Sequence, residues 1–137
     1  MSSWATLRSL SSDDWGVVLR CLWLIPAVEL NVRLRAPRHW LPAPVETAPL
    51  DSAAAGAPSA AAARVTHLVE ALYRRLPFSP TCLTRSLVVY RLLRARGIPC
   101  QLRIGLRKSG AALEGHAWTE TGQVPREADG FEVMLSF

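Results

Sequence analysis

The segment 78–122, which reads FSPTCLTRSLVVYRLLRARGIPCQLRIGLRKSGAALEGHAWTETG, constrains the fold more than any other part of the chain. Its first half predicts a helix over 80–96. Ser79 can cap this helix, and Pro80 suits the first helical position because proline lacks only a donor that would have no partner there. Gly97 is a natural left-handed end for the same helix.

The second half of the segment predicts an antiparallel hairpin. Residues 100–107 alternate between apolar and polar side chains, which is typical of a half-buried strand. The stretch KSGAAL is expected to connect it to a paired strand over 115–121, and 132–137 is expected to supply a third strand.

The N-terminal half predicts helices around a low-complexity connector. A helix is expected from about Asp13 to Arg35, with Ser11 or Ser12 as its cap and Pro26 kinking or splitting it. A second helix is expected over 62–75, with one apolar face.

Together these elements predict an α+β fold, in which N-terminal helices and a cysteine-bearing helix pack on a small antiparallel sheet. At 137 residues we expect a single domain in three parts. These are an apolar helical segment (1–41), an Ala/Pro-rich connector (42–63) and a core (64–137).

Cys82 and His116 are the residues that suggest chemistry. Cys82 falls in the first turn of the predicted helix, where unpaired N–H groups and the helix dipole stabilise a thiolate. His116 opens a strand that can carry its imidazole to that thiol, and such a pair is the minimum equipment for covalent acyl transfer. A buried structural cysteine is the plainer alternative, because free cysteines are common in cores. Cys82 shares an inward-facing stripe with Val89 and Leu93 but lies at the end of the helix, where a cleft could open.

Cysteine use and hydropathy bear on location. Cys21, Cys82 and Cys100 fit neither a disulfide framework nor a zinc site, so we expect no metal, no cofactor and a reducing cytoplasm. The N-terminus lacks the basic start of a secretory signal. The apolar stretch 15–34 is interrupted by charges and proline, which favours a core or partner-binding helix over a spanning one and leaves peripheral membrane contact open.

Basic charge is concentrated in the middle of the chain. Residues 64–107 hold nine arginines against the single acid Glu70. A solvated arginine face is the plain explanation. Nucleic acid is not the expected partner, because no stacking aromatics are interleaved with the arginines and no nucleic-acid motif is present. An acidic peptide or partner protein fits better.

The run SPTCLTRSLVVYRLLRARGIPCQLRIGLRK, followed by EGHAWTE, resembles the leader peptidases of lasso peptide biosynthesis. The resemblance covers roughly residues 64–127. It implies a transglutaminase-like core, related to papain-like enzymes, that removes the leader from a ribosomally made precursor peptide. It also implies two partners, a small separate leader-recognition protein and a cyclase. Arg85 matches the family pattern after the cysteine, and we expect it to form a structural ion pair.

The resemblance also implies an aspartate about a dozen residues after the histidine, to orient the imidazole. Here the sequence departs from the pattern, with Glu127 at eleven residues and Asp129 at thirteen. We favour Glu127, with Asp129 as the reserve. Glu120 is a poorer candidate, because it lies roughly 13 Å along the strand from His116.

Three functional hypotheses follow from these residues. The first is a cysteine peptidase acting on a lasso precursor with Cys82, His116 and Glu127. The second is a transglutaminase-like acyl transferase, in which an amine replaces water. The third is a non-catalytic scaffold that binds a peptide. The residues alone do not separate hydrolysis from transfer, because both use the same nucleophile.

Overall fold

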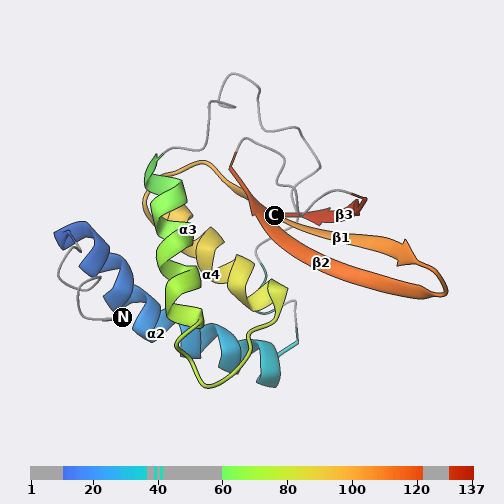
Figure 1. Ribbon diagram of the computed structural model, residues 1–137, viewed down its shortest axis with the longest axis horizontal. Coiled ribbons are helices and arrows are strands. Elements are labelled where there is room, and N and C mark those ends of the chain that lie inside the picture. Colours follow the sequence, from blue (N-terminus) through green and yellow to red (C-terminus); the bar gives the residue numbers. More distant parts are fainter. Residues whose placement is uncertain (1–10, 37–38, 40, 42–59, 122–129) are drawn as a thin grey trace, which may run out of the picture.

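In the part of the chain that the structure describes, three helices precede three strands (Figure 1). The computed structural model describes residues 11–36, 39, 41, 60–121 and 130–137. The predicted α+β fold class is confirmed. The elements are α2 (Ser12–Leu34), α3 (Ala60–Tyr73), α4 (Cys82–Ala95), β1 (Gln101–Ser109), β2 (Ala112–Glu120) and β3 (Glu132–Ser136).

Helix α2 begins at a capping box. The Ser11 hydroxyl accepts a hydrogen bond from the Asp14 backbone N–H, and the Asp14 carboxylate accepts one from the Ser11 N–H. Pro26 was expected to kink or split this helix. The split is wrong, because α2 runs through Pro26 without a break, and the kink stays a prediction. Proline removes a single ladder hydrogen bond, whereas Cys21 and Val28 on either side of it are anchored in the core.

Helix α4 begins two residues later than expected. Thr81, not Ser79, is the N-cap, and its hydroxyl accepts a hydrogen bond from the Thr84 N–H at 3.2 Å. Cys82 is therefore the first residue of the helix. The predicted end is confirmed, since Gly97 adopts the left-handed conformation with φ of 71°.

Helix α4 is the central element of the core. It lies between α3 on one side and the sheet on the other, while α2 packs across both helices (Figure 1). Apolar side chains from all three helices fill the space between them, among them Val17, Cys21, Val28, Val65, Val69, Leu87, Val88 and Leu93. Residues from the start of α2 to the end of the chain thus contribute to one core.

An ion pair between buried Asp14 and exposed Arg64 joins α2 to α3. The Arg64 guanidinium donates to both carboxylate oxygens of Asp14, at 3.1 and 2.8 Å. These hydrogen bonds hold the pKa of Asp14 well below its ordinary range. The last four residues of the predicted connector (60–63) belong to α3, while 42–59 lie outside the described residues.

The sheet is antiparallel with the order β2-β1-β3, so β2 is an edge strand. The predicted hairpin is confirmed, although its strands extend into KSGAAL and leave a turn at Gly110 and Ala111. The register sets Gly105 opposite His116. The far end of the hairpin projects beyond the helices (Figure 1).

No described helix combines the length and the apolar character needed to span a membrane.

Candidate active site

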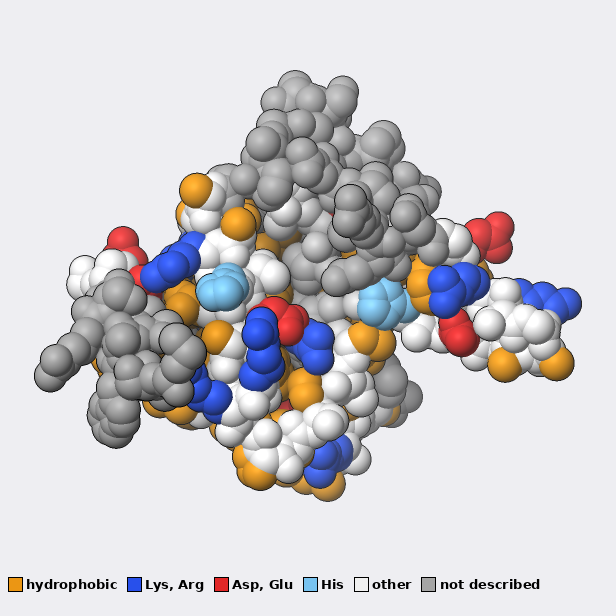
Figure 2. Space-filling view, in the orientation of Figure 1, with side chains coloured by type: hydrophobic (Ala, Val, Ile, Leu, Met, Phe, Trp, Pro, Cys, Tyr) orange, Lys and Arg blue, Asp and Glu red, His pale blue; other side chains and the backbone are white. Residues whose placement is uncertain are grey.

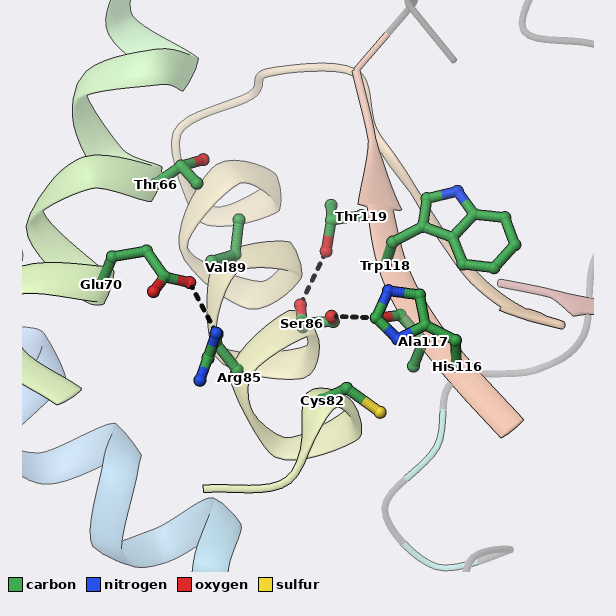
Figure 3. Close-up of a pocket in the computed structure, with 10 residues that line it drawn as sticks. All are labelled: Thr66, Glu70, Cys82, Arg85, Ser86, Val89, His116, Ala117, Trp118 and Thr119. Atoms are coloured by element: carbon green, nitrogen blue, oxygen red, sulfur yellow. Dashed lines mark hydrogen bonds and ion pairs between the residues drawn. The ribbon is translucent and has the colours of Figure 1, made fainter. Parts of the chain in front are cut away.

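Cys82 occupies the N-terminal end of α4, half-buried, with its sulfur pointing toward strand β2 (Figure 3). The first N–H groups of a helix have no acceptor within it. The Thr81 hydroxyl accepts a hydrogen bond from the Thr84 N–H. The N–H groups of Cys82 and Leu83 are then left next to the thiol. A carbonyl oxygen that becomes negative during attack by the Cys82 sulfur would meet these donors.

His116 lies on β2 and lines the same hollow as Cys82, which we call the cysteine–histidine hollow. Its volume is about 120 Å³. The structure therefore brings together the two residues that the sequence proposed as a pair. The other two histidines, His39 and His67, are exposed and do not line this hollow.

Two side-chain hydrogen bonds fasten the cysteine helix to the histidine strand. The Ser86 hydroxyl donates to the Ala117 carbonyl at 2.8 Å, and the Thr119 hydroxyl donates to the Ser86 carbonyl at 2.8 Å. We call this reciprocal contact the α4–β2 seam (Figure 3). Ser86 lies one turn after Cys82, and Ala117 directly follows His116. The seam therefore fixes how the thiol and the imidazole face each other.

Sequence reasoning missed the seam. The signal available was the polar Ser86 on the inward-facing stripe of α4, four residues after the cysteine. A buried hydroxyl in that position needs a partner, and the neighbouring strand provides one.

An aromatic shelf supports His116 from the side. Its ring stacks on Trp118 with centroids 5.9 Å apart, and Phe131 lies 5.2 Å away on a tilted plane. Gly105 makes room for this arrangement. A Cβ there would lie 2.9 Å from the Glu132 carbonyl oxygen and 3.0 Å from the Trp118 ring. Any larger residue would displace the shelf.

A sequence model described as the transglutaminase-like superfamily matches residues 24–136. The chain belongs to the transglutaminase-like superfamily. The match starts within α2 and includes α3, α4 and all three strands. No curated protein and no solved structure matches the chain significantly. A transglutaminase-like domain fits a cysteine peptidase or an acyltransferase.

The third member of a transglutaminase-like triad stays a prediction. Glu127 and Asp129 both lie outside the described residues. Buried Glu120 forms an ion pair with half-buried Arg103 on the sheet. The Glu120 carboxylate therefore has Arg103 as its partner.

The other two cysteines have the surroundings of core residues. Cys21 and Cys100 are buried, and burial raises the pKa of each thiol to about 11. All three cysteines are free, and Cys82 alone is not fully buried. Within the described ranges, no three His, Cys, Asp or Glu residues gather where they could hold a metal ion.

Proposed function

We propose that this protein is a cysteine peptidase that removes the leader from a ribosomally made lasso precursor peptide. The observation that carries the proposal is the placement of Cys82 and His116 in one open hollow, at the N-terminal end of a buried helix. The finer assignment to lasso precursors rests on the resemblance of CLTR, RGIP, LRIGLRK and HAW to that family.

In the proposed reaction His116 removes the proton from the Cys82 thiol, and the thiolate attacks the scissile carbonyl carbon. The N–H groups of Cys82 and Leu83 stabilise the oxyanion that forms. The imidazolium then gives its proton to the departing amine as the C–N bond breaks. Water hydrolyses the resulting thioester, releases the leader carboxylate and restores the thiol. Glu127 is proposed to accept a hydrogen bond from the other imidazole nitrogen.

We further propose that the leader-recognition partner docks on the outer face of α2. Its apolar side chains recur at helical spacing yet are exposed: Trp15, Leu19, Leu22, Trp23, Leu30 and Leu34. Between α2 and α4 lies a groove of about 510 Å³, with Arg20 and Arg91 among its lining residues. Such a surface suits a helix with apolar anchors flanked by carboxylates. The occupant we propose is a helix of the recognition protein.

The proposal is tested by mixing the chain with a lasso precursor and recognition protein, and following leader release by mass spectrometry. Cys82→Ala should abolish release, whereas His67→Ala, on an exposed position of α3, should not. Release by Cys82→Ala at the wild-type rate would disprove the enzymatic proposal. Added amines that become joined to the leader would identify an acyltransferase instead.

The docking proposal has its own variant. In Trp23→Ser, the recognition protein should accelerate leader release less than in the wild type. The variant should keep α2 folded, because the Trp23 side chain is 76% exposed. A full response in that variant would show that the partner binds elsewhere.

A further inference from the structure

A second hollow lies beside the cysteine–histidine hollow and shares a wall with it. Glu70 and Arg85 line both. The second hollow has a volume of about 360 Å³, and its other lining residues come from the end of α3 and the loop before α4: Tyr73, Arg74, Leu76, Pro77, Phe78, Ser79 and Pro80. We call it the arginine hollow. The link to the thiol is this shared wall, because Glu70 and Arg85 line the hollow that also contains Cys82.

The lining chemistry of the arginine hollow favours an anion. Arg74 and Arg85 carry two positive charges against the single negative charge of Glu70. The pair between Arg85 and Glu70 is loose, at 3.4 Å, and the Arg85 Nε has no hydrogen-bond partner among the described residues. Arg74 is exposed, and its side chain makes no ion pair with a described residue. Guanidinium donors therefore outnumber acceptors here.

The surface around the arginine hollow also carries basic side chains. Basic side chains flank an acidic one in the middle of the face that carries both hollows (Figure 2). Three of the nine arginines of segment 64–107 are neutralised by close acidic partners elsewhere, since Arg64 binds Asp14, Arg103 binds Glu120 and Arg107 binds Glu114. Among the described residues, the arginines at the arginine hollow have only Glu70 as an acidic neighbour, so a positive excess stays at this hollow.

We propose that the arginine hollow is a substrate subsite that takes an aspartate or glutamate side chain close to the scissile bond. This inference rests on the proposed peptidase function and adds its specificity. Successive residues of an extended peptide are about 3.3 Å apart, so a chain with its carbonyl at Cys82 brings a neighbouring side chain to this opening. A carboxylate there would be bound by Arg74 and by the N–H groups of Arg85 that Glu70 leaves free.

The plain alternative is that Arg74 belongs to a solvated basic face. To separate the two, variants of a lasso precursor would carry Asp, Asn or Lys singly at each residue flanking the scissile bond. At one position we expect kcat/KM to be roughly tenfold higher with Asp than with Asn, and lowest with Lys. The preference should shrink as salt is raised.

Charge variants of the protein complete the experiment. Arg74→Gln should remove the preference for Asp, and Arg74→Glu should reverse it in favour of Lys. Arg94→Gln is the matched control, because it removes the same charge from an exposed position on α4 outside the hollow. Cleavage without an acidic preference at any position, or a preference that survives Arg74→Glu, would overturn this inference alone. No cleavage of any variant by the wild-type protein would overturn the proposed function, and the subsite with it.

Discussion

The helical layer and the α4–β2 seam are held together in different ways. The contacts between α2, α3 and α4 are mainly apolar side chains, such as Val17, Val65 and Leu93, each at most 1% exposed. Between α4 and β2, the contact next to the thiol is instead two directional hydrogen bonds through Ser86. Apolar burial is non-directional and stabilises many similar arrangements, whereas hydrogen bonds fix one geometry.

We infer from this difference that the helical layer mainly determines stability, and that the seam and the aromatic shelf mainly determine reactivity. Substitutions in the helical layer should lower the free energy of unfolding and leave turnover of the folded protein intact. Substitutions at the seam and the aromatic shelf should lower turnover out of proportion to their effect on stability.

The largest effect is expected from His116→Ala. Loss of a general base typically costs 10²–10⁴-fold in rate, and we expect kcat to fall by about 10³-fold with KM little changed. The measurement is steady-state cleavage of a precursor peptide. His39→Ala is the control, since His39 is exposed and does not line the hollow. Equal losses in both variants would mean that His116 has no special role.

Next in size is the effect of the orienting acid. Glu127→Gln should lower turnover at least about 100-fold with binding nearly intact, because a carboxylate that fixes the imidazole tautomer acts on the rate. Asp129→Asn should do little, since Asp129 precedes Gly130 in what reads as a turn. The reverse result would transfer the role to Asp129. Two near-neutral variants would show that another group holds His116.

A smaller loss is expected at the seam. Ser86→Ala leaves the buried Ala117 carbonyl without its hydroxyl donor, and should cost about 1–3 kcal/mol of stability. Turnover of the folded protein should fall on the order of tenfold, because the thiol and imidazole are no longer held in register. Turnover should be near normal in Thr119→Ser, which keeps the hydroxyl, and lower in Thr119→Val, which lacks it.

In the helical layer, Val65→Ala should lower the free energy of unfolding by about 2 kcal/mol yet leave turnover of the folded protein unchanged.

The last comparison makes a glycine-to-alanine substitution at the aromatic shelf and another in the helical layer, and the second is the smallest effect expected. Gly105→Ala should cost about 1–3 kcal/mol and reduce turnover, because its Cβ would meet Trp118 and the Glu132 carbonyl at 3.0 and 2.9 Å. Gly16→Ala, in α2, meets nothing within 4 Å and should raise stability by about 0.5–1 kcal/mol. Thermal unfolding of both variants checks the signs. A neutral Gly105→Ala would contradict the crowding of the shelf.

Local patterns account for what was predictable. The capping box at Ser11, the left-handed Gly97 and the alternation along β1 each depend on residues close in sequence. The start of α4 was misplaced because Ser79 and Thr81 are both competent caps. The pairing of Cys82 with His116 in one hollow followed from a helix end, a hairpin and the resemblance to a family.

The seam could not be predicted, because a hydroxyl that reaches the backbone of another element leaves no periodic pattern in the sequence. The role of Gly105 was hidden for a similar reason. A side chain at position 105 would collide with Trp118 on β2 and with the Glu132 backbone on β3, so glycine is required there. The orienting acid stays open because a one-residue difference in the connection after β2 exchanges Glu127 for Asp129.

The central claim is that Cys82 and His116 act as a pair, and thiol labelling tests it most directly. Wild-type protein would be pulsed with iodoacetamide at neutral pH, and each modified cysteine would be mapped by mass spectrometry. The account predicts that Cys82 is modified first and that its labelling slows markedly in His116→Ala. Cys21 and Cys100, whose thiol pKa burial raises to about 11, should react only on unfolding. Equal labelling of Cys82 with and without His116, or earlier modification of Cys21 or Cys100, would contradict it.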